Sequence, residues 1–255
     1  TQTILREIIL QNLWKILVWK TKMKRILLLS IFFILCLFLD GCSPLKQYEQ
    51  DTYAWAIPEI EKFKELDTKE DYAPKSILFL GSSSIRLWET LKEDMAPMPL
   101  IQRGYGGAHF RDLIFYIDTI LNQHDLSMIV CFVANDISQK NSNESVKTIL
   151  RNYDYVIKRI RKKHPTLPIL QISITPTESR WHLWPKINEL NMALKDYCAS
   201  HSKMVFLETT SLFLNAEGLP KKELFRSDKL HLNKEGYILW NSLIRPQVET
   251  ILAAQ

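Results

Sequence analysis

Five short apolar runs alternate with longer amphipathic segments along most of the chain. Nearly every position in these runs is apolar, which is typical of strands that are buried on both faces. Between the runs, apolar residues recur at helical spacing, most clearly over Glu144–Lys163, a segment followed by Pro165 and Pro168. Further helices are predicted over 51–66, 84–91, 185–201 and 234–252. The predicted strands are Ser76–Leu80, Pro99–Gln102, Met128–Val133, Ile169–Ile174 and Met204–Leu207.

Strands that alternate with helices predict a parallel sheet with helices on both faces. We therefore predict a single-domain, three-layer α/β/α fold of the flavodoxin-like kind, with a mostly parallel five-stranded sheet. A chain of 255 residues that is 46% apolar is sufficient to build the core of such a domain.

The net charge of +5 is unevenly distributed. Residues 1–41 hold six of the 33 basic side chains and two of the 28 acidic ones, so residues 42–255 hold 27 basic and 26 acidic side chains. The body of the protein is therefore nearly neutral, which removes the main support for a nucleic-acid partner.

The excess of basic residues near the N-terminus has its own explanation. Met23, Lys24 and Arg25 precede an apolar run over 26–39. This run is shorter than the roughly 20 residues that a membrane span needs, and the pattern is typical of a secretory signal. The end of the run, "LDGC", resembles the lipobox of bacterial lipoproteins, in which the cysteine, here Cys42, is lipidated.

This resemblance implies an exported cell-envelope lipoprotein that is anchored to a membrane by its lipid. Asp40 departs from the small residue that is usual at its position, and an uncleaved signal anchor is the alternative. The expected organisation is an upstream extension over 1–22, a signal peptide over 23–41, a tether over 42–50 and a folded domain over 51–255.

Polar and glycine-rich segments follow three of the predicted strands, where open parallel sheets bind their ligands. Four of the seven glycines lie in the first two of these loops, which suggests sharp turns or backbone N–H groups offered at close range. The three segments are Gly81-Ser82-Ser83-Ser84, Gly104-Tyr105-Gly106-Gly107 and Ala134-Asn135-Asp136.

A fourth candidate lies before the last predicted helix, where Asp228 precedes His231 by three residues. At that spacing the carboxylate can reach the imidazole Nδ1–H, which would fix the tautomer and stabilise the imidazolium. Serine becomes a nucleophile only when a base takes its proton, so His231 is the expected base for a serine.

Each segment alone is compatible with a structural turn, a helix cap, a phosphate-binding loop or an ordinary histidine. A phosphate-loop cofactor protein would leave Asp228 and His231 unexplained. No CxxC or His/Cys cluster indicates a metal site, and we expect neither a metal nor a cofactor. Cys131 and Cys198 leave a disulfide open.

The four segments, in this order over residues 76–240, resemble the SGNH/GDSL hydrolase family. The resemblance implies a carboxylic ester hydrolase that forms an acyl-enzyme on Ser83. It assigns Asp228 and His231 to the rest of the catalytic triad. It also assigns the oxyanion hole to Ser83, Gly107 and Asn135.

Three positions depart from the family pattern. Ser82 replaces the usual Asp, Ser84 replaces an apolar residue, and Val133 stands where Gly is usual. Val133 could reshape the floor beneath Asn135, but none of these changes removes a reacting group.

Trp181, Trp184 and Arg103 are candidates for the substrate pocket, since indole faces stack on sugars or pack on acyl chains. We expect short acyl esters, especially acetyl esters, of carbohydrate or of envelope components as substrates. A lipase or lysophospholipase, an acyltransferase, and a catalytically silent envelope-binding lipoprotein are the alternatives.

Overall fold

The computed structural model describes residues 19–25, 48, 50–122, 124–138 and 144–255. The chain divides into two compact units, Thr1–Ser43 and Pro44–Gln255. In the first unit residues 19–25 are helical, whereas Cys42 and the apolar run of the predicted signal peptide lie outside the described residues. Within the ranges described, no helix has the length and hydropathy that a membrane span requires.

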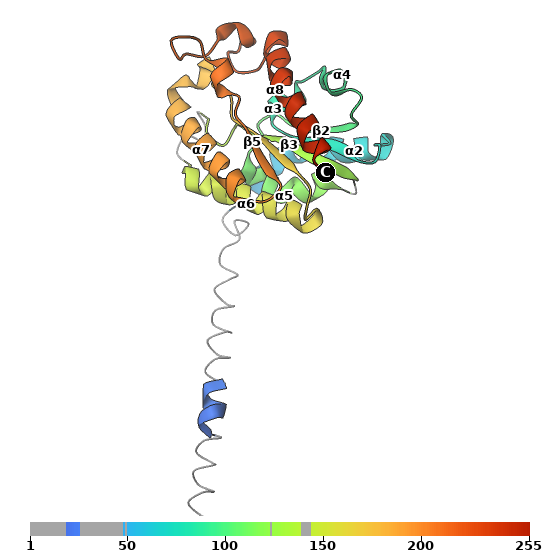
Figure 1. Ribbon diagram of the computed structural model, residues 1–255, viewed down its shortest axis with the longest axis vertical. Helices are drawn as coiled ribbons and strands as arrows, with labels where there is room; N and C mark the ends of the chain where they lie inside the picture. Colours follow the sequence, from blue (N-terminus) through green and yellow to red (C-terminus); the bar gives the residue numbers. More distant parts are fainter. Residues whose placement is uncertain (1–18, 26–47, 49, 123, 139–143) are drawn as a thin grey trace, which may run out of the picture. The chain divides into compact units, whose positions relative to one another are not determined.

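The second unit contains a five-stranded sheet in the order β2-β1-β3-β4-β5, in which every neighbouring pair is parallel (Figure 1). This confirms the predicted fold class. The strands are β1 Ser76–Gly81, β2 Leu100–Gly104, β3 Leu126–Phe132, β4 Ile169–Ile172 and β5 Met204–Leu207. Strand β4 ends two residues before its predicted end. The Ser173 N–H still donates to the Leu207 carbonyl at 3.0 Å, and the chain leaves the sheet beyond it.

Helices connect the strands and cover both faces of the sheet. In place of the single helix predicted over 84–91, the structure has two short helices, α3 and α4. The helix over Phe110–Leu121, α5, was not predicted. The α-helices are α2 Ile57–Lys69, α3 Ser83–Arg86, α4 Leu91–Met95, α5 Phe110–Leu121, α6 Val146–Lys163, α7 Trp184–Ser200 and α8 Lys234–Ala253. The 3-10 helices are η3 Gln50–Ala56, η4 Glu178–Leu183, η5 Thr210–Phe213 and η6 Lys222–Leu224.

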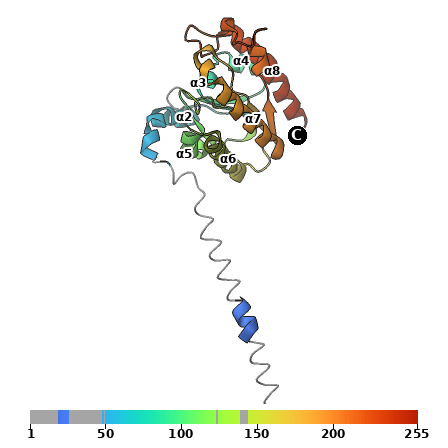
Figure 2. The same cartoon turned by 90° about the vertical axis from the view of Figure 1, so that its left-hand side faces the viewer.

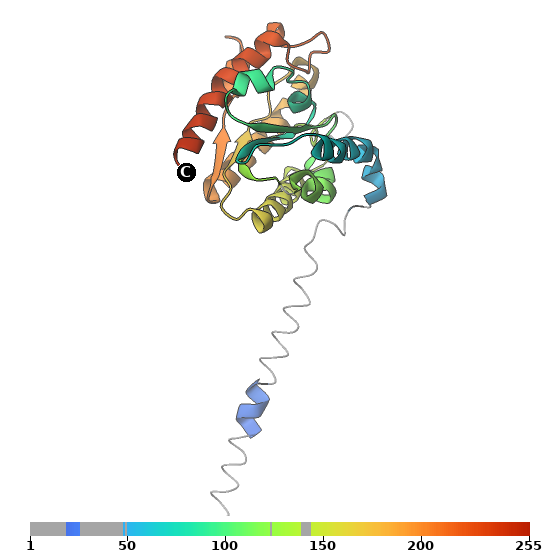
Figure 3. The same ribbon diagram turned by 90° about the vertical axis from the view of Figure 1, so that its right-hand side faces the viewer.

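Two apolar cores result, one on each face of the sheet. Helices α2, α5, α6 and α7 cover one face, and α3, α4 and α8 cover the other (Figures 2 and 3). Alternate residues of β1 divide between them, so that Leu78 belongs to the first core and Phe79 to the second. Burial on both faces explains why the strands read as continuous apolar runs. Cys131 and Cys198 are buried and free, so they do not form the disulfide that the sequence left open.

Candidate active site

The turn between β1 and α3 places Ser83 at the carboxyl end of β1, the strand between β2 and β3. A Cβ on Gly81 would overlap the carbonyl oxygen of Phe132 on the neighbouring strand, so only glycine fits there. The N–H of the next residue, Ser82, donates to that same carbonyl at 2.9 Å. Ser83 is the first residue of α3. Because it lies in the first turn, its backbone N–H has no acceptor within the helix.

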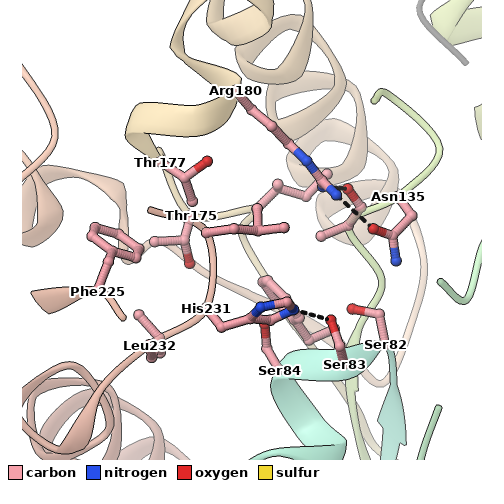
Figure 4. A pocket seen from close by; sticks show the side chains of 14 residues that line it. Ser82, Ser83, Ser84, Asn135, Thr175, Thr177, Arg180, Phe225, His231 and Leu232 are labelled. Atoms are coloured by element: carbon pink, nitrogen blue, oxygen red, sulfur yellow. Dashed lines mark hydrogen bonds between the residues drawn. The ribbon is translucent and has the colours of Figure 1, made fainter. Parts of the chain in front are cut away.

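Ser83, His231 and Asp228 form a hydrogen-bonded chain. Ser83 Oγ lies 2.8 Å from His231 Nε2 (Figure 4). On the other side of the imidazole, His231 Nδ1 lies 2.6 Å from Asp228 Oδ2. The structure therefore brings together the three residues predicted as a triad, although Ser83 and His231 are 148 residues apart. With Nδ1–H donating to the carboxylate, Nε2 is the nitrogen that can accept the serine proton.

The two carboxylate oxygens of Asp228 have separate partners. Oδ2 faces the imidazole, whereas Oδ1 accepts the backbone N–H groups of Leu230 and His231, each at 2.9 Å. The turn that results passes through Lys229, whose φ of 60° is in the left-handed region. Burial by itself raises the pKa of Asp228, but the hydrogen bonds from His231 and Leu230 outweigh it and hold the pKa below its usual range. The carboxylate is therefore ionised when the histidine becomes charged.

Asn135 and Asp136 follow β3 and bind the glycine loop. Asn135 Nδ2 donates to the Ala108 carbonyl at 3.1 Å, and both carboxylate oxygens of Asp136 lie 3.1 Å from the Phe110 N–H. Asp136 is buried, and this burial raises its pKa to about 7. The two side chains thus hold the segment that runs from the glycine loop into α5.

The glycine loop packs closely against α3. A Cβ on Gly104 would overlap the backbone nitrogen of Arg86, and one on Gly106 would lie 3.2 Å from the Arg86 guanidinium. Gly107 has a φ of 79°, a backbone conformation that residues with a side chain rarely adopt. A Cβ placed on Gly107 would lie 3.3 Å from the ring of Trp55. Trp55 is 46% exposed and comes from η3, ahead of the first strand. The sequence analysis did not identify Trp55, because this residue precedes the first strand and the analysis looked for site residues after the carboxyl ends of strands.

A small pocket opens beside Ser83 and His231 (Figure 4), with a volume of about 30 Å³. Phe132, Ile174, Phe225 and Leu232 give it apolar walls, and Asn135 lies at its edge. Three polar residues after β4 also line it: Thr175, Thr177 and Arg180. The sequence analysis considered the segment after the fourth strand but assigned only its tryptophans, Trp181 and Trp184, to the pocket.

The three predicted pocket residues do not line this pocket. Arg103 is 1% exposed, forms an ion pair with Asp67 and donates to the Tyr72 hydroxyl at 2.9 Å, so it ties β2 to α2 and cannot contact a leaving group. Trp181 and Trp184 stack on each other, with ring centroids 5.8 Å apart, next to Arg180 in the chain. Their rings are half-buried and lie outside the lining of the pocket.

The described residues offer no group of three or more His, Cys, Asp or Glu side chains that is placed to hold a metal ion. The side chains of the site supply a nucleophilic hydroxyl, an oriented base and an amide donor. This set is suited to acyl transfer through a covalent intermediate.

Solved structures share this fold. A GDSL-like lipase from Bacteroides thetaiotaomicron has a TM-score of 0.62 and 17% identity over 75% of this chain and 98% of its own. A lipase/acylhydrolase from Enterococcus faecalis has a TM-score of 0.58 and 20% identity over 69% and 96%. A carbohydrate esterase of family 3 from Talaromyces cellulolyticus has a TM-score of 0.55 and 15% identity over 71% and 99%. At these identities the likeness establishes the fold alone.

The sequence comparison identifies the family. A search of curated proteins finds no match to this chain. The model of the GDSL-like lipase/acylhydrolase family matches residues 81–239, more than half of the chain, and this range contains the serine, the glycine loop, the asparagine and the Asp-x-x-His turn. The chain therefore belongs to the GDSL-like lipase/acylhydrolase family and is a carboxylic ester hydrolase.

Proposed function

We propose that the protein hydrolyses short acyl esters, especially acetyl esters, of carbohydrate or other envelope components through an acyl-enzyme on Ser83. One observation carries this proposal: the hydrogen-bonded chain Asp228–His231–Ser83 ends at a pocket of only about 30 Å³. A binding protein needs no serine in contact with an oriented base, and so small a pocket favours a small acyl group.

Acylation begins with attack of Ser83 Oγ on the ester carbonyl carbon, while the hydroxyl proton passes to His231 Nε2. The carbonyl oxygen becomes negatively charged and accepts hydrogen bonds from the N–H groups of Ser83 and Gly107 and from Asn135 Nδ2. Asp228 stabilises the imidazolium without taking its proton. The C–O bond to the alcohol then breaks, and the alcohol leaves with the proton from Nε2.

Deacylation repeats these steps with water. His231 Nε2 takes a proton from a water molecule, whose oxygen attacks the acyl carbon of the ester on Ser83. The second tetrahedral intermediate uses the same three donors. It collapses to a carboxylic acid, and Ser83 Oγ recovers its proton from the imidazolium.

The dimensions of the site support a small acyl group and a larger polar alcohol. Pockets for drug-sized ligands typically have volumes of about 300–1,000 Å³, roughly ten or more times the volume beside Ser83. A larger hollow of about 270 Å³ shares Phe225 with the pocket and is otherwise lined by Glu178, Lys222, Arg226, Ser227 and Lys229. These polar side chains suit the hydroxyl groups of a carbohydrate.

We also propose that the protein is exported and anchored to the cell envelope by a lipid on Cys42. The support is the sequence over 23–42: basic residues, an apolar run and the "LDGC" motif. Cys42→Ser should move the protein from the membrane fraction to the soluble fraction, as followed by immunoblot. Retention of this variant in the membrane would favour an uncleaved signal anchor.

The three adjacent serines allow a matched test of the nucleophile. Residues 43–255 would be assayed for 4-nitrophenyl acetate hydrolysis and for labelling by a fluorophosphonate, with Ser83→Ala and Ser84→Ala beside the parent. We expect Ser83→Ala to lose at least about 10³-fold in kcat and all labelling, because the hydroxyl forms the covalent bond. Ser84→Ala should stay within about threefold, since its hydroxyl has no reacting role in this mechanism.

The acyl preference is tested with the acetate, butyrate and octanoate esters and with acetylated oligosaccharides. Preference for the octanoate would overturn the short-acyl proposal. A folded parent that neither hydrolyses esters nor takes the label would overturn the assignment of Ser83 and favour the envelope-binding alternative.

A further inference from the structure

We propose that Arg180 is a positioning residue for the oxyanion hole: its guanidinium holds the Asn135 amide with the nitrogen turned toward the reacting carbonyl oxygen. This inference rests on the proposed function, since it assumes that Asn135 donates to the oxyanion. It adds a residue that neither the triad nor the resemblance to the family includes.

Arg180 reaches from η4, after β4, to the end of β3 (Figure 4). Its Nη1 donates to the Ala134 carbonyl at 2.5 Å, and its Nη2 donates to Asn135 Oδ1 at 2.7 Å. One guanidinium thus fixes both the backbone just before Asn135 and the oxygen end of its side chain.

The partners of Arg180 differ from those of two other shielded arginines, Arg103 and Arg111. Arg103 is paired with Asp67, and Arg111 is paired with Glu144. Arg180 lines the pocket, and both of its hydrogen bonds go to neutral oxygens. Burial lowers the pKa of its guanidinium. Within the described part of the chain the guanidinium bonds these two neutral oxygens and no carboxylate, which leaves its positive charge available to the reaction.

The hydrogen bonds of Asn135 show what this contact does. An amide side chain can be turned by 180°, which exchanges its oxygen and its nitrogen. With Oδ1 bound to Arg180 and one N–H of Nδ2 donated to the Ala108 carbonyl, the other N–H remains for the oxyanion. A turned amide would present its oxygen to the developing negative charge, which would repel it.

The same contact strengthens the remaining donor. A cation bound to the oxygen of an amide draws electron density toward that oxygen and makes its N–H groups better donors, as in other hydrogen-bond chains. The oxyanion exists only in the tetrahedral intermediates and the transition states next to them. Loss of Arg180 should therefore lower kcat and leave KM nearly unchanged.

A double-mutant cycle on the whole protein tests the inference, with Arg180→Met, Asn135→Ala and the double variant assayed on 4-nitrophenyl acetate. We expect Asn135→Ala to lower kcat by about 10²–10³-fold, as loss of one oxyanion donor typically does. Arg180→Met should lower kcat by about 10–100-fold with KM within about twofold. In the Asn135→Ala background it should have almost no further effect, because Arg180 acts through that amide.

Two further variants separate positioning from folding. Arg161 also donates to backbone carbonyls, those of Leu167, Ser202 and Lys203, and it does not line the pocket. Arg161→Met should therefore leave kcat unchanged in folded protein. Arg180→Lys keeps the charge and a donor and should recover part of the loss. If Arg180→Met fails to fold, Arg180→Lys and Arg180→Gln carry the same cycle.

Three outcomes would overturn the inference: additive effects in the cycle, an Arg180→Met variant with wild-type kcat, or a rise in KM alone. The last outcome would indicate that Arg180 binds the substrate directly. Failure of the proposed function is recognised separately, because in that case the parent and Ser83→Ala would have the same activity before Arg180 is changed.

Discussion

The replacement Asp228→Asn separates the chemical role of this carboxylate from its structural one. Oδ1 of Asp228 accepts two backbone N–H groups, and only Oδ2 faces His231. In the variant, the amide oxygen can keep both backbone bonds while the amide nitrogen takes the place of Oδ2. His231 Nδ1 must then accept from that nitrogen. Its proton moves to Nε2, which faces Ser83 and can no longer take the serine proton.

The size of the effect follows from the exposure of the carboxylate. For a buried triad aspartate this substitution lowers kcat by about 10⁴-fold. The Asp228 side chain is 46% exposed, so water can take over part of its role. We therefore expect a loss of about 10²–10³-fold in kcat/KM, which is about 3 to 4 kcal/mol of transition-state stabilisation.

The assay is hydrolysis of 4-nitrophenyl acetate at pH 7.5, with urea unfolding measured in parallel. The free energy of unfolding of Asp228→Asn should lie within about 1 kcal/mol of that of the parent, because the turn keeps its hydrogen bonds. Asp228→Ala loses the carboxylate and the turn together, and should lower both activity and stability. Activity of Asp228→Asn within fivefold of the parent would refute the tautomer argument, and a large loss of its stability would refute the division between the two oxygens.

Three other substitutions test the structure around the site. Burial raises the pKa of Asp136 from 3.8 to about 7, so the folded state keeps a proton that the unfolded chain releases. Stability should therefore fall as the pH rises from about 4 to 7, and urea titrations of Asp136→Asn should show a flatter profile over that range. Asp67→Ala leaves the Arg103 guanidinium buried without its carboxylate. Urea unfolding should show a free energy of unfolding that is about 3–5 kcal/mol lower. A decrease of under about 1 kcal/mol would mean that water replaces the carboxylate. Gly107→Ala places a Cβ at a φ of 79° and 3.3 Å from the Trp55 ring. It should lower the free energy of unfolding by about 1–2 kcal/mol, measured by thermal unfolding, and it should also lower kcat. An unchanged kcat would argue against the Gly107 N–H as an oxyanion donor.

The strands could be predicted because strands that are buried on both faces consist almost entirely of apolar residues. Helix α5 was not predicted, for two physical reasons. Its sequence contains five consecutive apolar residues over 113–117, and such a short run cannot be distinguished from a buried strand by periodicity alone. It also begins at His109, which caps the helix together with Asp112, instead of at one of the usual capping residues.

The site was predictable to the extent that it follows from strand ends. The serine, the glycine loop and the asparagine follow the ends of neighbouring strands, which a parallel sheet must bring to one edge. His231 follows no strand directly and was predicted from its spacing to Asp228 before the last helix. Arg103 was assigned wrongly because its partner, Asp67, lies 36 residues earlier and nothing in the local sequence indicates the pair. The contact between Arg180 and Asn135 could not be predicted either, since it depends on how far a long side chain reaches between two loops.

The register of three neighbouring strands, β2, β1 and β3, explains why the dispersed residues meet. Gly81 pairs with Gly104 on β2 and with Phe132 on β3, so all three strands end at the same level. Ser83, Gly107 and Asn135 each follow these ends by two or three residues. Asn135 and Asp136 then bind the backbone on either side of His109, which fixes the glycine loop relative to β3. A shift of one residue in either strand pairing would move one donor by about 3.3 Å, which is more than a hydrogen bond tolerates. The proposed oxyanion hole therefore depends on strand register as much as on the identity of its residues.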